Sequence, residues 1–169
     1  MMISHVGRRE TSKVWSEPPC PMTYGHFQEE MMRRVLKASG EFEVRYSTEL
    51  DVVYKLDAVA LSTRNLRLPP VGIQFTTRRS PQKRQKAMDV VRRTQVVERF
   101  LYLHALAPIN LEASAILCSL VTLVATLDSS RGIVTAGLAT DHQGSFHLTN
   151  LRSFPMAKHL ESFACERAA

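Results

Sequence analysis

Asp57 and Gln74 are the residues whose type and placement most suggest chemistry, because each lies in an otherwise apolar segment. Residues 54–59 and 71–76 are rich in strand formers, so we predict two strands, with Asp57 in the middle of its own. A carboxylate on one strand and an amide oxygen on the next are suitable ligands for Mg²⁺ or Mn²⁺ in phosphodiester hydrolysis. The alternatives are a salt bridge from Asp57 to Lys55 or to an arginine, and a Gln74 that merely faces a polar helix.

Three other polar residues are expected near this pair. Thr76 lies two residues after Gln74, and Lys55 lies two residues before Asp57, so strand alternation puts each on the face of its neighbour. Glu29 lies on the flank of a predicted helix, where its carboxylate could complete a metal site. An ordinary solvent-facing glutamate is the alternative for Glu29.

Positive charge is concentrated in one segment of the chain. The net charge is +6 and the pI about 9.5, yet residues 64–99 hold ten Lys and Arg against only Asp89 and Glu98. A local basic surface attracts polyanions, so we predict DNA as the partner, with RNA as the alternative. The predicted nucleic-acid-binding residues are Arg78, Arg79, Lys83, Arg84 and Lys86. The competing interpretation is an ordinary solvated helix face.

Several classes of site are disfavoured by the sequence. Cys20, Cys118 and Cys165 show no CxxC spacing, so we expect neither a zinc site nor a disulfide framework, and we assign a reducing, cytoplasmic location. The glycine-rich nucleotide motifs, the GxSxG elbow and HxxxH are missing from the sequence. Residues 111–127 are apolar but interrupted by Ser, Thr and Glu, so we predict a buried element and no membrane span.

The hydrophobic patterns predict one α/β domain over 21–169, preceded by a flexible arm over 1–20. Ser80 and Pro81 predict the start of a second helix, and Asn110 that of a third, for which a strand is the rival. The expected helices are 24–38, 81–94 and 111–127, with a short one after 157. The expected strands are 42–46, 50–61, 71–77 and 98–105, followed by a hairpin of 132–140 with 145–151.

Residues 24–105 resemble the PD-(D/E)xK nuclease superfamily, and within it the archaeal-type Holliday-junction resolvases. Those proteins have a first helix in which Glu follows Gly by four residues, as Glu29 follows Gly25 here. They have an Asp at the second strand, here Asp57, and then a strand carrying (D/E)-x-K. The corresponding residues here are Gln74-Phe75-Thr76, and a basic helix follows, as in the family.

The resemblance implies a restriction-endonuclease-like three-layer sandwich, a mixed central sheet flanked by helices, and Mg²⁺-dependent DNA cleavage. It implies that Glu29, Asp57 and Gln74 hold the metal and that Asp57, Gln74, Thr76 and Lys55 form the catalytic set. Thr76 stands where the family has lysine, and Lys55, Arg78 or Lys83 are the substitutes for its charge. A homodimer would suit cutting of both strands. The alternatives are an inactive nuclease fold that serves as a nucleic-acid-binding or assembly module, and an interaction protein with no nucleic-acid role.

Overall fold

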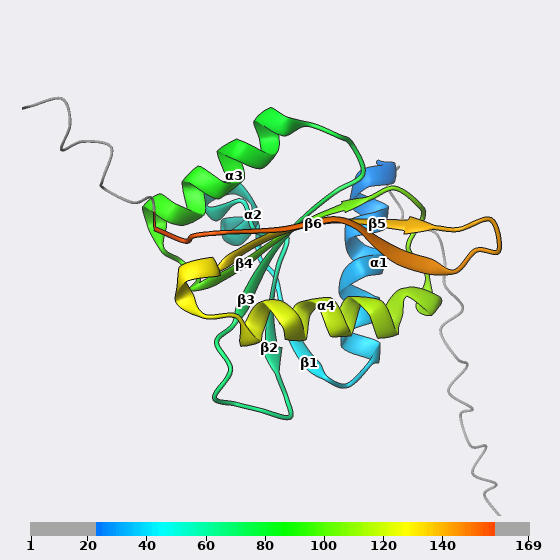
Figure 1. The fold of residues 1–169 in the computed structure, drawn as a ribbon, viewed down its shortest axis with the longest axis horizontal. Helices are drawn as coiled ribbons and strands as arrows, with labels where there is room; N and C mark the ends of the chain where they lie inside the picture. Colours follow the sequence, from blue (N-terminus) through cyan, green and yellow to red (C-terminus); the bar gives the residue numbers. More distant parts are fainter. Residues whose placement is uncertain (1–22, 158–169) are drawn as a thin grey trace, which may run out of the picture.

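Six strands form one mixed sheet in the order β1–β2–β3–β4–β5–β6 in the computed structural model, which describes residues 23–157 (Figure 1). The first three strands are antiparallel, β3, β4 and β5 are parallel, and β6 returns antiparallel to β5. The strands are β1 Phe42–Arg45, β2 Ala58–Ser62, β3 Val71–Thr76, β4 Arg99–Ala105, β5 Ile133–Thr140 and β6 Phe146–Phe154. The predicted α/β class with a mixed sheet is confirmed.

Helices cover both faces of this sheet and make three layers. Helices α1 and α4 pack on one face, which we call the α4 face, and α2 and α3 pack on the other, the α3 face. Strand β4 serves both layers, because Leu101 and Leu103 point to the α4 face and Phe100 and Tyr102 to the α3 face. The helices are α1 Tyr24–Ala38, α2 Thr48–Tyr54, α3 Pro81–Thr94 and α4 Ser114–Thr126, with 3₁₀ turns at Leu111–Ala113 and Ser129–Arg131.

The predicted strand 50–61 is wrong in its first half. Residues 48–54 form α2, because the Ser47 side chain caps the helix by accepting from the Leu50 N–H, and two acids occupy its first turn. Lys55 ends α2 in the left-handed region with φ 57°. Strand β2 begins only at Ala58, so Asp57 lies just before it and not mid-strand. Lys55 and Asp57 therefore do not share a strand face.

The other elements agree with the patterns. Ser80 caps α3 with Pro81 in the first turn, and residues 111–127 are helical as predicted, with α4 buried against the sheet. The hairpin forms, and β6 continues to Phe154. None of the helices in 23–157 is both long and apolar enough to cross a membrane. The predicted arm 1–20 and tail helix after 157 fall outside the described residues.

A bulge in the β5–β6 hairpin changes which side chains face the two layers. Thr135 pairs with Arg152 and Gly137 pairs with Thr149, so β6 has one extra residue between these pairs. Asn150 lies in this bulge with φ 50°.

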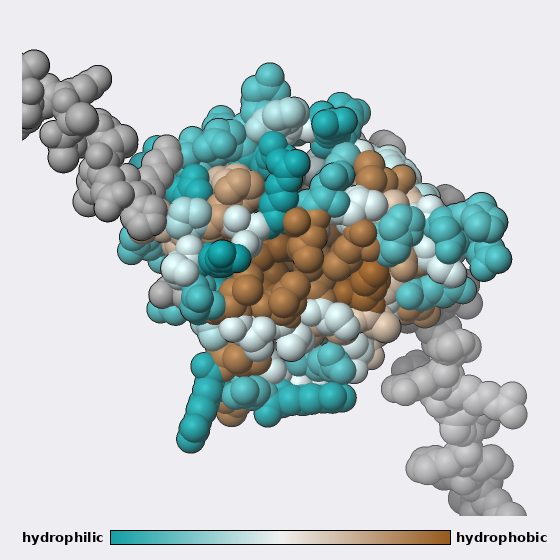
Figure 2. All heavy atoms as spheres, in the orientation of Figure 1, coloured by the Kyte–Doolittle hydropathy of each residue, from teal (hydrophilic) through white to brown (hydrophobic). Residues whose placement is uncertain are grey.

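The view in Figure 2, which shares the orientation of Figure 1, shows a hydrophobic area along α4 and the adjoining sheet, framed by hydrophilic side chains.

Candidate nuclease-like site

A cleft of about 560 Å³ gathers the predicted catalytic and metal-binding residues. It lies between the start of α1, the end of α2, the facing ends of β2 and β3, and the first half of α3. Its lining includes Glu29, Lys55, Asp57, Gln74 and Thr76. We call it the Asp57 cleft. These five residues come from three separate stretches of the chain, and the fold brings them together.

Asp57 is held by hydrogen bonds to its N–H, to its carbonyl and to one oxygen of its carboxylate. Its side chain is almost fully buried, at 4% exposure, and Oδ2 accepts from the Phe75 N–H at 2.6 Å and from Gln74 Nε2 at 2.8 Å. Its own N–H donates to the Ile73 carbonyl at 2.8 Å. Within residues 23–157 the Asp57 carboxylate forms no salt bridge, which was the predicted alternative. It accepts hydrogen bonds from these two uncharged donors instead.

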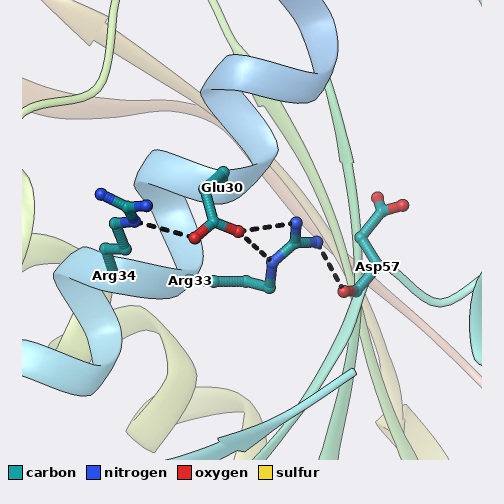
Figure 3. A network of polar contacts seen from close by, with 4 residues as sticks. All are labelled: Glu30, Arg33, Arg34 and Asp57. Carbon is teal, nitrogen blue, oxygen red and sulfur yellow. Dashed lines mark hydrogen bonds and ion pairs between the residues drawn. The ribbon is translucent and has the colours of Figure 1, made fainter. Parts of the chain in front are cut away.

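Arg33 supports the backbone of Asp57 from α1. Its Nη1 donates to the Asp57 carbonyl at 3.1 Å, and its guanidinium lies 4.5 Å from the centre of the Tyr46 ring. Glu30 pairs with Arg33 at 3.0 Å and with Arg34 at 2.8 Å. Figure 3 shows that the Asp57 carboxylate points away from this network, so the arginine positions the loop and leaves the carboxylate to the cleft.

Burial, with a contribution from neighbouring acids, raises the pKa of both Asp57 and Glu29. Burial, reinforced by the charge of Glu29, raises the pKa of Asp57 to about 7, although the Phe75 N–H acts in the opposite direction. Burial also raises the pKa of Glu29, against the lowering effect of His26 and Arg33, and the Asp51 carboxylate contributes to the rise. Ionising buried, neighbouring carboxylates costs free energy, and a bound cation offsets that cost. Raised carboxylate pKa values of this kind are therefore common at functional sites.

The donor set fits a hard cation with a small number of protein ligands. Glu29 and Asp57 offer carboxylate oxygens, and Gln74, whose Nε2 is taken by Asp57, keeps its carbonyl oxygen as a neutral ligand. Within residues 23–157, no group of three or more His, Cys, Asp or Glu side chains is placed to hold a metal. A cation here would depend on water or on a ligand phosphate for its remaining coordination.

Thr76 brings no charge to the cleft, and its hydroxyl closes a turn. It donates to the Arg78 carbonyl at 3.0 Å and accepts from the Arg78 N–H at 3.1 Å. Positive charge reaches the cleft from elsewhere. Lys55 enters from the end of α2, and Lys83 and Lys86 enter from α3. Lys55 thus lies in the cleft for a different reason from the strand alternation that predicted it.

The five predicted nucleic-acid-binding residues divide between two hollows. Lys83 and Lys86 line the Asp57 cleft, Arg79 and Arg84 line a neighbouring pocket of about 330 Å³, and Arg78 lines both. We call the second hollow the Tyr102 pocket. Its other polar lining residues, which the sequence did not single out, are Tyr102, His104, Thr135, Asn150 and Arg152. The aromatic-rich strand 98–105 was the only signal that could have drawn attention to them.

No protein-family model matches the chain, and the comparisons with curated proteins and with solved structures also found no match.

Proposed function

We propose that this protein is a metal-dependent nuclease-like protein that binds DNA across the Asp57 cleft and hydrolyses a phosphodiester bond there. The observation that carries the proposal is the meeting of Glu29, Asp57 and Gln74 with Lys55 and Lys83 in one cleft. Oxygen ligands suited to a divalent cation and ammonium groups suited to a phosphate are the two requirements of such chemistry.

The topology agrees with the resemblance to the PD-(D/E)xK superfamily. Apart from α2, the order of elements is α1, three strands, α3 and β4, as expected from the sequence. The three strands are antiparallel, and β4 is parallel to β3. Gly25 and Glu29 on α1, Asp57 before β2 and Gln74 on β3 all line the same cleft. The motif positions are therefore arranged as a shared site would require.

The roles of the chain's own residues follow from their places. A bound Mg²⁺ or Mn²⁺ would supply Lewis-acid chemistry, and Glu29, Asp57 and the Gln74 carbonyl oxygen would hold it. The Phe75 N–H keeps the Asp57 carboxylate in one orientation. Lys55 and Lys83 stabilise negative charge on the phosphate, which is the role of the missing motif lysine.

The test is cleavage of plasmid DNA and labelled duplexes with Mn²⁺, with Mg²⁺ and with EDTA. We expect cutting only with a metal, and a loss on the order of 100-fold or more in Asp57→Asn, because electrostatic stabilisation at the reacting phosphate is lost. Glu43→Gln is the matched control, since it neutralises an exposed acid on β1 outside the cleft. Equal cutting by wild type and Asp57→Asn would contradict the proposal.

A second candidate, a nuclease fold that binds nucleic acid without cutting it, is favoured by one observation. The family has a second acid at the position of Gln74. Here a neutral amide that donates to Asp57 replaces that negative charge. This candidate predicts salt-sensitive DNA binding in EDTA and no cutting with any metal. The double change Gln74→Glu and Thr76→Lys restores the motif, and on this candidate it should introduce Mn²⁺-dependent cutting into an otherwise inactive protein.

A further inference from the structure

The Tyr102 pocket contains a buried hydrogen-bond donor that has no partner. Tyr102 is 5% exposed, and its hydroxyl makes no hydrogen bond within the part of the chain that the structure describes. The Thr76 hydroxyl lies beside the phenol, but its proton is donated to the Arg78 carbonyl, and its geometry to Tyr102 is not that of a hydrogen bond. Burial is the larger influence and raises the pKa of Tyr102, so the phenol keeps its proton and is available to donate.

The charge around this donor is of one sign. Four arginines line the pocket, from the β3–α3 loop, from α3 and from β6, and no acidic side chain is among the lining residues. None of the four forms an ion pair with another residue of 23–157. The arginines are Arg78, Arg79, Arg84 and Arg152. Burial lowers the pKa of His104, and the charge of Arg79 lowers it further, so this ring adds a neutral polar group at pH 7.

The backbone of the β5–β6 hairpin is shaped around the pocket. The bulge keeps Arg152 opposite Thr135 on the α3 face, and Asn150 adopts φ 50°, a conformation that costs free energy for a residue other than glycine. Gly137 forms part of the lining, and a Cβ there would collide with the Thr149 hydroxyl, a second buried polar group without a partner in the described chain. Thr149 is not among the lining residues, so the pocket itself combines the backbone of Asn150 with the Tyr102 hydroxyl, which has no partner in the described chain. Strain beside such a hydroxyl indicates a ligand site.

We propose that the Tyr102 pocket binds the terminal phosphate of a nucleic-acid strand. A terminal phosphate is a phosphomonoester that carries close to two negative charges at pH 7, whereas each backbone diester carries one, so four unpaired guanidinium groups favour the monoester. The pocket, at about 330 Å³, has room for the phosphate and the sugar attached to it.

The position of the pocket connects it to a strand. The pocket shares Thr76, Arg78 and Tyr102 with the Asp57 cleft, so a strand that ends in the pocket continues into the cleft. In this respect the inference rests on the proposed function, because it takes the cleft to be the nucleic-acid path. Recognition of the end itself needs only the pocket, and it requires neither a metal nor cleavage.

The experiment measures binding of one labelled oligonucleotide in EDTA, with a 5′-phosphate, with a 3′-phosphate or with hydroxyls at both ends. We expect one phosphorylated form to bind about tenfold tighter than the hydroxyl form, the size of effect expected for a few charge-assisted hydrogen bonds. Inorganic phosphate should remove this difference at concentrations that leave binding of the hydroxyl form unchanged. The two phosphorylated forms identify which end of the strand the pocket receives.

Two variants and a control locate the effect. Tyr102→Phe keeps the ring and removes the donor, and Arg152→Ala removes a charge that lies outside the predicted DNA-binding set. Each should reduce the preference for the phosphorylated end to about twofold, measured against binding of the hydroxyl form by the same variant. Arg67→Ala is the control, an exposed arginine in the β2–β3 loop that lines neither hollow. Thermal unfolding confirms that every variant is folded.

Each outcome separates this inference from the proposed function. Equal binding of phosphorylated and hydroxyl ends by the wild type, or a full preference in Tyr102→Phe, would overturn the pocket assignment even if the protein cuts DNA. A clear preference in a protein that never cuts would support the pocket and contradict the nuclease. A wild type that binds none of the three oligonucleotides would overturn the terminal-phosphate assignment as well.

Discussion

The Asp57 cleft and the Tyr102 pocket differ in how their central polar group is satisfied. In the Asp57 cleft the buried carboxylate already accepts two hydrogen bonds, and both acidic and basic side chains line the walls. In the Tyr102 pocket the buried hydroxyl has no partner within the described chain, and all the formal charges are positive. In the cleft, hydrogen bonds already hold the carboxylate, and a cation would add the missing positive charge. The pocket has hydrogen-bond donors that an anion would accept from.

The largest expected effect that tests this contrast is the pH dependence of Asp57. The folded protein holds the Asp57 proton up to about pH 7, whereas the group ordinarily titrates near 3.8. Between these values the folded state binds more protons, so stability falls as pH rises, by on the order of 2–4 kcal/mol. Asp57→Asn removes this loss and should be the more stable protein at pH 8.

The measurement is chemical unfolding at several pH values from 5 to 8, in EDTA, for wild type, Asp57→Asn and the control Glu43→Gln. The control should follow the wild type, because Glu43 is exposed on β1. Parallel curves for wild type and Asp57→Asn would mean that the carboxylate is not destabilised by burial. Mn²⁺ added at pH 8 should recover part of the loss in the wild type alone, since a ligand of the folded state stabilises it.

A smaller effect is expected from Gln74→Leu. This change removes one of the two donors to Asp57 Oδ2 and leaves the Phe75 N–H as the other. Weakening the hydrogen bonding of a buried charge costs about 1–3 kcal/mol, and the cost should be greater at pH 8, where Asp57 is ionised, than at pH 5. The same unfolding series measures it. A loss that is independent of pH would assign Gln74 a packing role only.

The smallest effect, and the opposite one in sign, is expected in the pocket. Tyr102→Phe removes a hydroxyl that has no hydrogen bond to lose, so without phosphate the variant should match the wild type or exceed its stability by about 0.5–1 kcal/mol. With phosphate present, the wild type should gain more stability than the variant. Thermal unfolding with and without phosphate provides the measurement. Destabilisation of the variant in both conditions would mean that the phenol has a structural partner.

The residues of the cleft could be predicted from the sequence because they are polar residues in apolar segments. An acid and an amide in apolar segments stand out, and Ser80-Pro81 and the basic run place α3 beside them. The same reasoning failed at residues 50–54, where Val52, Val53 and Tyr54 favour a strand and the Ser47 cap makes a helix. The lesson is that a local cap outweighed the strand propensity of three residues.

The sequence could not predict the Tyr102 pocket, because its members have no shared pattern. Tyr102 is an ordinary strand residue until β5 and β6 are placed beside it, and Arg152 faces the pocket only because of a bulge in the register. Arg33 was missed for a similar reason, since its contact with the Asp57 carbonyl joins residues 24 positions apart. Long-range pairing, which a single sequence does not encode in a readable form, decides all three.

The wall that the two hollows share would couple the two proposed ligands thermodynamically. Thr76, Arg78 and Tyr102 belong to both linings, and the charge of Asp57 reaches the Tyr102 phenol. A phosphate bound on one side of this wall would attract a cation bound on the other, so each ligand would raise the affinity for its counterpart. Reciprocity fixes the size of the exchange: the factor by which a phosphate tightens cation binding is the factor by which the cation tightens phosphate binding. A strand end bound in the pocket would thereby favour loading of the cation in the cleft beside it.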